Sequence, residues 1–271
     1  MKFIDKLDAA TKNNNSLLCV GLDINLNSLP QPLLNQDDPI FLFASQIIKA
    51  TQDLVCAYKP NMAFFEKYGI YGLESLIKII ELIKAETNVP VILDAKRGDI
   101  GHSSAAYAES VFKVFKADAV TVNPYLGFDS VEPFLEYRDK GIFILCLTSN
   151  PGARDFQLKG QKDPLYQAVA QKAKQWNRFG NCGLVAGATN PNELAKIREL
   201  VGNMLILIPG IGAQGGELKA TVAAGLGPEN ARVIINSSRN ILYASKNDDF
   251  AQAARSAAKK LRDEINAYRS R

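Results

Sequence analysis

The chain has 271 residues, of which 47% are apolar and 22% are charged, and its net charge is +4. This composition is that of an ordinary globular protein, so it argues against a disordered or a fibrous chain. The small positive excess favours neither a nucleic-acid groove nor a membrane-seeking surface, but it suits a local site for an anionic ligand. A chain of this length can form one large domain with a well-buried core.

The number and positions of the cysteines and the histidine further limit the classes of protein to which the chain can belong. The four cysteines are far apart and each lies in an apolar stretch, which indicates buried, reduced thiols and a cytoplasmic protein. The single histidine, His102, argues against a histidine-rich metal site and against a Ser-His-Asp hydrolase. We expect neither a secretion signal nor a membrane span, because no apolar run reaches the ~18 residues that a span needs.

Eight short apolar runs recur along the chain and predict the strands of one parallel sheet. They are rich in Val, Ile and Leu, and apolar and polar residues mostly do not alternate in them, as in strands buried on both faces. The runs are residues 17–22, 54–58, 89–93, 117–122, 142–147, 182–186, 204–208 and 232–235.

Amphipathic stretches of helical length alternate with these runs. In the first of them, Ile40, Phe43, Ala44 and Ile47 fall on one helical face. Helices are expected at residues 39–51, 73–84, 103–115, 129–137, 165–179, 192–200, 216–224 and 248–268. Eight strands, each followed by a helix, predict a (β/α)8 TIM barrel of the α/β class that occupies residues 1–271 as a single domain.

A doubly wound open sheet is the alternative arrangement. Such sheets typically have fewer strands and usually begin with a glycine-rich first turn. Here the first run ends in Gly21-Leu22-Asp23, which is not a GxGxxG turn, so the barrel is favoured. In a barrel of this kind the active site lies at the C-terminal ends of the strands.

The third apolar run is followed by charges in the order acid, base, acid. Asp94 and Lys96 are two residues apart, so on a strand their side chains point to the same side, and Asp99 follows after a glycine. Together with Lys59, which follows the second run, they predict a row of alternating charges. Flanking carboxylates favour the ammonium form of Lys96, which suits proton donation or carbanion stabilisation better than Schiff-base chemistry. The alternative is a salt-bridge network that only closes the barrel mouth.

The segments after the seventh and eighth runs predict a phosphate site. Residues 209–216 (PGIGAQGG) are glycine-rich and open a helix, whose first backbone N–H groups can bind phosphate. Arg239 can bind the same group through two hydrogen bonds, and barrels often bind phosphate at this position. A plain tight turn and a surface ion pair are the alternatives for these two features.

Four motifs together resemble the orotidine 5′-phosphate decarboxylase family. They are YKPN at residues 58–61, DAKRGDIG at 94–101, PGIGAQGG at 209–216 and NSSR at 236–239. DAKRGDIG and the run TVNPYLG at residues 121–127 resemble the longer bacterial subgroup that is often called type 2. The resemblance extends from Gly21 to Arg239 with the motifs in the family's order.

The resemblance implies conversion of orotidine 5′-monophosphate to UMP and CO2, the last step of de novo pyrimidine synthesis. It implies neither a metal nor an organic cofactor, and a homodimer in which Asp99 reaches the site of the partner subunit. It also implies that Lys96 donates a proton to C6, that Asp94 lies beside the leaving carboxylate, and that Lys59 completes the charged network. The substrate-binding residues that it implies are Asp23 for the ribose, Ser149 for the pyrimidine, Gln214 and Arg239 for the phosphate, Pro209 and Gly210 at the start of the phosphate loop, and also Ser103 and Asn123.

Two other functions are compatible with parts of this pattern. A sugar-phosphate decarboxylase or aldolase of the same superfamily shares the D-x-K-x-x-D string but uses Mg2+, with an acidic ligand near the second strand. Lys59 follows that strand here and would repel a cation. The other alternative is a non-catalytic nucleotide-binding protein on a degenerate barrel, against which the complete charged network argues.

Overall fold

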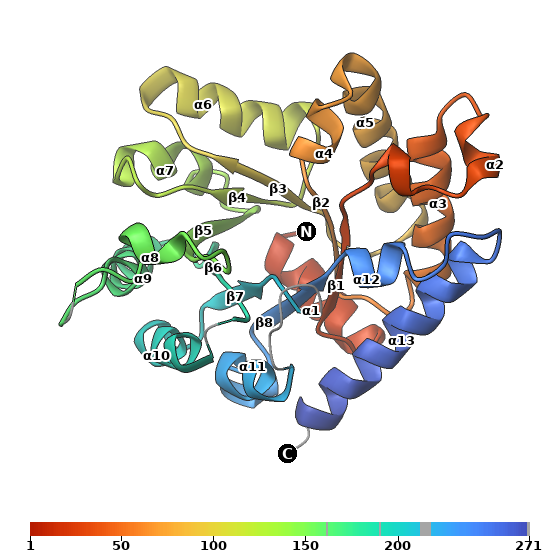
Figure 1. Cartoon of the computed structure of the whole chain (residues 1–271). Coiled ribbons are helices and arrows are strands. Elements are labelled where there is room, and N and C mark those ends of the chain that lie inside the picture. Colours follow the sequence, from red (N-terminus) through yellow and green to blue (C-terminus); the bar gives the residue numbers. More distant parts are fainter. Residues whose placement is uncertain (161, 190, 212–217, 270–271) are drawn as a thin grey trace.

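The chain forms a closed barrel of parallel strands surrounded by helices (Figure 1). The computed structural model describes residues 1–160, 162–189, 191–211 and 218–269. Eight strands form one sheet in the order β2-β1-β8-β7-β6-β5-β4-β3. The two end strands of this order meet through bridges between Tyr58 and Val91 and between Asn61 and Asp94. The predicted (β/α)8 barrel is therefore confirmed.

The predicted alternation of strands and helices is also present. The strands are β1 Leu18–Leu22, β2 Ala57–Pro60, β3 Ile92–Arg97, β4 Ala119–Val122, β5 Gly141–Leu147, β6 Cys182–Ala186, β7 Leu205–Ile208 and β8 Val233–Ser237. The helices that correspond to the predicted ones are α3 Pro39–Thr51, α5 Gly69–Glu86, α6 Gly101–Glu109 with the π-helical turn Ser110–Val114, α7 Phe128–Leu135, α9 Leu165–Trp176, α10 Pro191–Val201, α11 Leu218–Gly225 and α13 Phe250–Arg269. Further helices, which the pattern did not predict, are α1 Phe3–Asn13, α2 Gln31–Leu34, α4 Ala63–Glu66, α8 Ala153–Phe156 and α12 Arg239–Leu242, with 3-10 turns at Leu26–Ser28 and Pro228–Asn230.

Strands β2, β3 and β8 begin and end later than the apolar runs predicted. Hydropathy marks the part of a strand that is packed in apolar surroundings, whereas the backbone pairing continues into the polar residues that follow. Lys59, for example, is paired in register with Gly21 of β1. Lys59, Asp94 and Lys96 therefore lie within strands and not after them, so the sheet itself holds their backbone.

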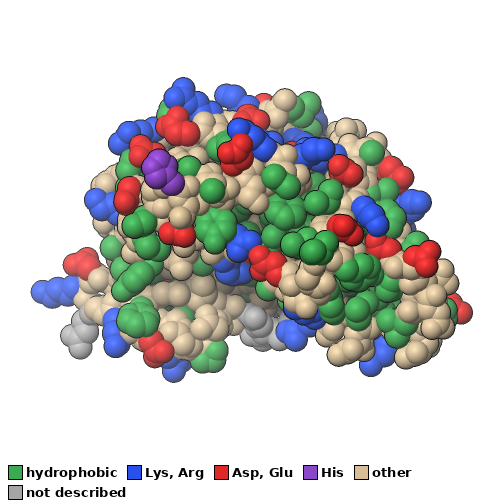
Figure 2. All heavy atoms as spheres, turned by 90° about the horizontal axis from the view of Figure 1, so that it is seen from above, with side chains coloured by type: hydrophobic (Ala, Val, Ile, Leu, Met, Phe, Trp, Pro, Cys, Tyr) green, Lys and Arg blue, Asp and Glu red, His purple; other side chains and the backbone are tan. Residues whose placement is uncertain are grey.

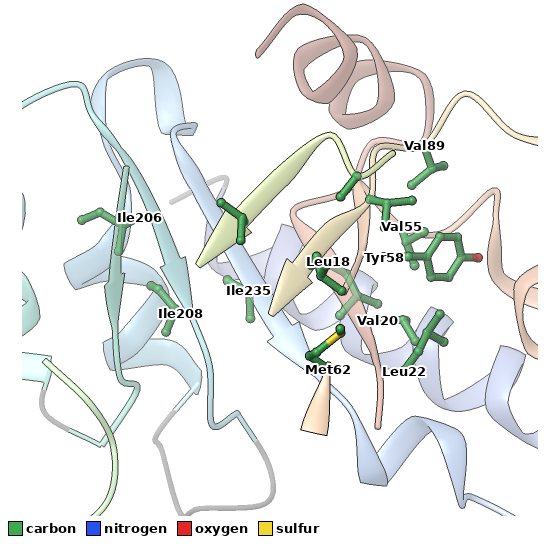
Figure 3. Close-up of a cluster of buried hydrophobic side chains, with 14 of the residues drawn as sticks. Leu18, Val20, Leu22, Val55, Tyr58, Met62, Val89, Ile206, Ile208 and Ile235 are labelled. Carbon is green, nitrogen blue, oxygen red and sulfur yellow. The ribbon is translucent and has the colours of Figure 1, made fainter. Parts of the chain in front are cut away.

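Alternate residues of each strand enter two separate hydrophobic layers. Leu18, Val20 and Leu22 of β1 pack in the layer between the strands and the outer helices (Figure 3), whereas Cys19 belongs to the cluster inside the barrel. Because successive side chains of a strand point to opposite faces, one apolar run supplies both layers. This explains why the runs show little alternation of polar and apolar residues.

Helix α1 closes the N-terminal end of the barrel. Its Phe3 and Leu7 belong to the cluster inside the barrel, and the Phe3 ring packs edge-on against Phe143 at 5.8 Å between ring centroids. Gly141, the first residue of β5, leaves room for this contact, since a Cβ atom there would collide with the Phe3 ring. In Figure 1, α1 lies inside the ring of outer helices. The N-terminal end is thus filled with side chains, and the opposite end is left for a site.

Candidate active site

A cavity of about 410 Å3 lies at the C-terminal ends of the strands. It brings together residues from distant parts of the sequence. The predicted site residues in its lining are Asp23, Lys59, Asp94, Lys96, Ser149, Pro209, Gly210 and Arg239. A second cavity of about 440 Å3 lies near the opposite end, beside Phe3 and Leu205, and contains none of them. The position of the first cavity is therefore the one that a barrel enzyme requires.

Lys59, Asp94 and Lys96 form a charged cluster in this cavity. Lys59 Nζ donates to Asp94 Oδ2 and Lys96 Nζ donates to Asp94 Oδ1, each at 2.7 Å. Lys59 and Asp94 are 3% and 9% exposed, whereas the side chain of Lys96 is 47% exposed. The buried pair thus anchors the cluster, and Lys96 is the end that a ligand can reach.

The charges of the buried pair stabilise each other. Burial raises the pKa of Asp94, but the ammonium groups of Lys59 and Lys96 outweigh this effect and hold that pKa well below its usual range. Burial likewise lowers the pKa of Lys59, yet the carboxylates of Asp94 and Asp23 bring it above its usual value. Asp94 and Lys59 are therefore both ionised at neutral pH. With formal charges, the three clustered side chains carry one positive charge in excess.

A β-bulge in β3 determines where Lys96 points. The three residues from Asp94 to Lys96 stand opposite the single residue Thr121 of β4, and bulges of this kind redirect side chains beside active sites. Lys96 has a φ of 45°, in the left-handed region that residues with a side chain seldom adopt. The expectation that Asp94 and Lys96 share a side is confirmed by their contact. However, the regular strand assumed from the sequence is wrong at this point.

The remaining residues of the lining differ in what they offer a ligand. Asp23 follows β1, and its Oδ1 is buried without a hydrogen-bond partner among the residues that the structure describes. Such an acceptor is suited to a hydroxyl donor from a ligand. Arg239 is exposed at the start of α12. Gly210 follows β7 with a φ of 99°, a conformation that favours glycine and turns the chain sharply.

Three predicted residues do not line the cavity of their own chain. Asp99 Oδ1 accepts a hydrogen bond from the N–H of Ile100 at 2.8 Å, and Asn123 Oδ1 accepts one from the N–H of Tyr125 at 3.0 Å. Ser103 is exposed on α6. The row of alternating charges therefore ends at Lys96 within the described part of this chain. A fourth predicted residue, Gln214, lies outside the described residues.

Six polar residues of the cavity were not selected as site residues from the sequence: Asn61, Thr121, Thr148, Asn150, Asn236 and Ser238. Four of them lie within the quoted motifs, and Thr148 and Asn150 do not. Three of them could have been found from the two-residue period of a strand. Asn61, Thr121 and Asn236 each lie two residues from an inward-facing neighbour, so they lie on the inward side of their strands. Gly21 permits this crowding, since a Cβ atom at that position would collide with Ser238.

The described residues include buried cysteines, but they form neither a metal-binding cluster nor a membrane-spanning helix. All four cysteines are free and buried, as predicted, and burial raises the pKa of the Cys56 thiol to about 12. Within the described ranges, no three His, Cys, Asp or Glu side chains are grouped so that they could hold a metal ion. No helix in those ranges is both long enough and apolar enough to cross a bilayer.

Comparison with known proteins identifies the family. The sequence pattern of the "Orotidine 5'-phosphate decarboxylase / HUMPS family" matches residues 16–256. The chain belongs to this family. Its resemblance to orotidine 5′-phosphate decarboxylases, which the motifs predicted, is thereby confirmed.

Members of the family resemble this chain over almost its whole length. It is 52% identical to the orotidine 5′-phosphate decarboxylase of Cupriavidus taiwanensis, over 99% of both chains, and 53% identical to that of Roseiflexus castenholzii, over 98% of both chains. A solved structure, the OMP decarboxylase of Leishmania donovani, is 41% identical, covers 100% of both chains and has a TM-score of 0.88. The UMP synthase of Leishmania donovani also matches at a TM-score of 0.88 and 44% identity, covering 99% of this chain and 56% of the other.

Proposed function

We propose that this chain catalyses the decarboxylation of orotidine 5′-monophosphate to UMP and CO2, the last step of de novo pyrimidine synthesis. The observation that carries the proposal is the Lys59–Asp94–Lys96 cluster in a cavity at the C-terminal end of the barrel. The curated decarboxylases at 52–53% identity over nearly the whole chain support it. The reaction as proposed needs neither a metal nor an organic cofactor.

Lys96 is the proposed proton donor. When the bond between C6 and the carboxylate breaks, its electron pair stays on C6 and CO2 leaves. The pyrimidine ring delocalises this pair poorly, so the Lys96 ammonium would stabilise it and then transfer a proton to form the C6–H bond. The charge on C6 develops only towards the transition state, so this interaction lowers the barrier more than it tightens substrate binding.

Asp94 and Lys59 would prepare Lys96 for this step. The two hydrogen bonds of 2.7 Å hold the Asp94 carboxylate between the two ammonium groups before any substrate arrives. Groups that are already oriented do not have to reorganise during the reaction, which is a major source of catalysis. Asp94 would lie beside the leaving carboxylate of the substrate.

The rest of the cavity suits the remainder of the nucleotide. Arg239, Pro209 and Gly210 line the same cavity as Lys96, so one ligand can contact both regions. We propose that they bind the phosphate together with Gln214. Binding of this distant, non-reacting group can supply energy that positions the ring. Asp23 Oδ1, which has no hydrogen-bond partner among the described residues, would accept a hydrogen bond from a ribose hydroxyl.

Three further residues complete the proposed substrate contacts, one of them at the pyrimidine and two of them exposed. Ser149 lines the cavity and would contact the pyrimidine. Ser103 and Asn123 lie outside the cavity of their own chain. We propose that they contribute to substrate binding only after association of two chains brings them to a cavity.

We propose a homodimer that uses the side of the molecule bearing α6. Ile100, Leu126 and Tyr125 on this side are 54%, 46% and 80% exposed, and exposed apolar groups of this size are typical of interaction surfaces. Figure 2 looks down onto the side where α5 and α6 lie and shows hydrophobic side chains among the charged ones. Asp99 precedes Ile100 and would reach the cavity of the partner subunit.

We also propose that residues 1–271 act as one domain in the cytoplasm and belong to the type 2 subgroup. The eight strands are all members of one sheet, and the buried thiols fit a reducing compartment. The bacterial decarboxylases at 52–53% identity match 99% of the chain, which fits a subgroup of longer enzymes.

The experiment that tests this function follows the ultraviolet absorbance of orotidine 5′-monophosphate with purified protein and EDTA. The wild-type protein should lower the absorbance rapidly. Lys96→Ala should lose at least about 1000-fold in kcat, because it removes both charge stabilisation and proton donation. Lys172→Ala, which changes an exposed lysine of α9 outside the cavity, is the matched control and should keep full activity.

The outcomes separate the alternatives. No decline with folded wild-type protein would refute the proposed function, and a sugar phosphate with Mg2+ would be tested next, followed by simple binding of UMP. Near-normal turnover by Lys96→Ala would show that another group donates the proton.

A further inference from the structure

Thr121 of β4 contacts both Asp94 and Lys96 of β3. It lies within β4 Ala119–Val122, is 1% exposed and lines the cavity. Its Oγ1 donates to Asp94 Oδ1 at 2.8 Å and accepts a hydrogen bond from the backbone N–H of Lys96 at 3.0 Å. One hydroxyl group therefore connects the side chain of Asp94 with the backbone of Lys96.

The bulge in β3 explains why a side chain is needed at this point. Three residues of β3 stand opposite Thr121, so the backbone of β4 cannot pair with all of them. The Thr121 hydroxyl takes the Lys96 N–H in place of a backbone carbonyl. Lys96 also has a φ of 45°, which is strained for a residue with a side chain and persists only when its surroundings hold it. A hydrogen bond to its own N–H is such a restraint.

Thr121 also restricts the carboxylate of Asp94. Oδ2 of that group accepts from Lys59, and Oδ1 accepts from both Lys96 and Thr121. Two ammonium groups alone allow the carboxylate to turn with the flexible lysine side chains. The third donor comes from a buried, β-branched residue on a paired strand, whose side chain has little freedom to rotate. It therefore fixes the plane of the carboxylate.

We infer that Thr121 is a positioning residue, which sets the placement of the Lys96 ammonium relative to Asp94 for the decarboxylation. The inference rests on the proposed function. Thr121 acts through Asp94 and Lys96 and needs no contact with the substrate. A displacement of about 1 Å of a reacting group can reduce a rate about 100-fold, so loss of this hydroxyl should slow the chemical step without weakening phosphate binding.

The test compares Thr121→Val, which keeps the shape and removes the hydroxyl, with Thr121→Ser, which keeps the hydroxyl. Thr121→Val should lower kcat about 10- to 100-fold and change KM less than about threefold. Thr121→Ser should keep kcat within about threefold of wild type. The matched control is Thr51→Val, because Thr51 is also fully buried and its Oγ1 donates to Ile47 O at 2.8 Å, away from the cavity. It should keep normal kcat.

Equal kcat for Thr121→Val and Thr51→Val would overturn the inference, and so would a serine variant as slow as the valine variant. Melting temperatures show whether each variant is folded, and Thr121→Ala replaces the valine variant if that one is not. An inactive wild-type protein would refute the proposed function instead. In that case a crystal structure of Thr121→Val tests the positioning of Lys96 apart from the reaction: loss of the positive φ at Lys96 shows that Thr121 positions this residue, and an unchanged Lys96 refutes the inference.

Discussion

The two ends of the barrel interior are filled by opposite kinds of side chain. At the N-terminal end, Phe3 of α1 packs against Phe143 in an apolar cluster. At the C-terminal end, the inward-facing positions carry charged and polar groups such as Lys59 and Asp94. Strand β4 shows the transition, because Ala119 belongs to the apolar cluster and Thr121, two residues later, bonds to the charged one.

This difference indicates that the two ends serve separate purposes. Packing at the apolar end contributes free energy of unfolding through the area that it buries. At the polar end, interactions between buried charges are stronger than in water, but each unpaired charge would be costly. Substitutions at the apolar end should therefore lower stability and spare turnover, whereas substitutions at the polar end should chiefly lower turnover or weaken substrate binding.

After Lys96→Ala, Lys59→Met should give the largest effect at the polar end. It removes one partner of Asp94, so kcat should fall about 100- to 1000-fold through loss of the oriented cluster. The pKa of Asp94 is below its usual range in the wild type. The stability contributed by its ionised form is therefore present above the unfolded pKa near ~4 and is lost as pH falls through the folded pKa. In Lys59→Met that pKa rises toward the unfolded value, so both this contribution and the fall in stability that it causes at acid pH should be smaller.

Free energies of unfolding of the two proteins, measured from pH 3 to pH 8, would show this smaller dependence on pH. Lys78→Met, which changes an exposed lysine paired with Asp38 on another face, is the control and should keep normal kcat. An equally large fall in stability between pH 8 and pH 3 in wild type and Lys59→Met would contradict the assignment of Lys59 as the group that keeps Asp94 ionised.

Phe3→Ala tests the apolar end. Removal of a buried aromatic side chain leaves a cavity, so the free energy of unfolding should fall by about 3–5 kcal/mol. Turnover per folded molecule should stay within about twofold, because Phe3 does not line the proposed active site. Urea denaturation and steady-state kinetics measure the two quantities, with the half-buried neighbour Ile4→Ala as a milder control. A parallel fall in kcat would mean that the two ends are coupled.

Arg239→Ala should have the smallest effect. Within the polar end it separates substrate binding from the chemical step. Arg239 is exposed at the mouth and outside the charged cluster, so its loss should chiefly raise KM, by about 10- to 100-fold, through weaker phosphate binding. Its stability should change by less than about 0.5 kcal/mol. Inorganic phosphate should also inhibit the variant less than the wild type. A lower kcat at unchanged KM would place Arg239 in the chemical step.

Much of the site was visible in the sequence because apolar runs end where inward-facing polar residues begin. The cluster of Lys59, Asp94 and Lys96 was predicted in this way, and the structure brings the three side chains together. Thr121 was not selected. The two-residue period places Thr121 on the inward side of its strand, but its hydrogen bond to Asp94 joins residues 27 positions apart, which no local pattern reveals.

The sequence by itself determined the repeated β/α pattern, the end of the barrel that carries the site, and the residue types that meet there, because hydrophobic period and strand order are local properties of the chain. Only the tertiary structure decided the bulge that gives Lys96 its positive φ and the closure of the opposite end by α1. These features depend on contacts between elements distant in sequence. Such contacts are selected by packing and hydrogen bonding in three dimensions, which no local pattern records.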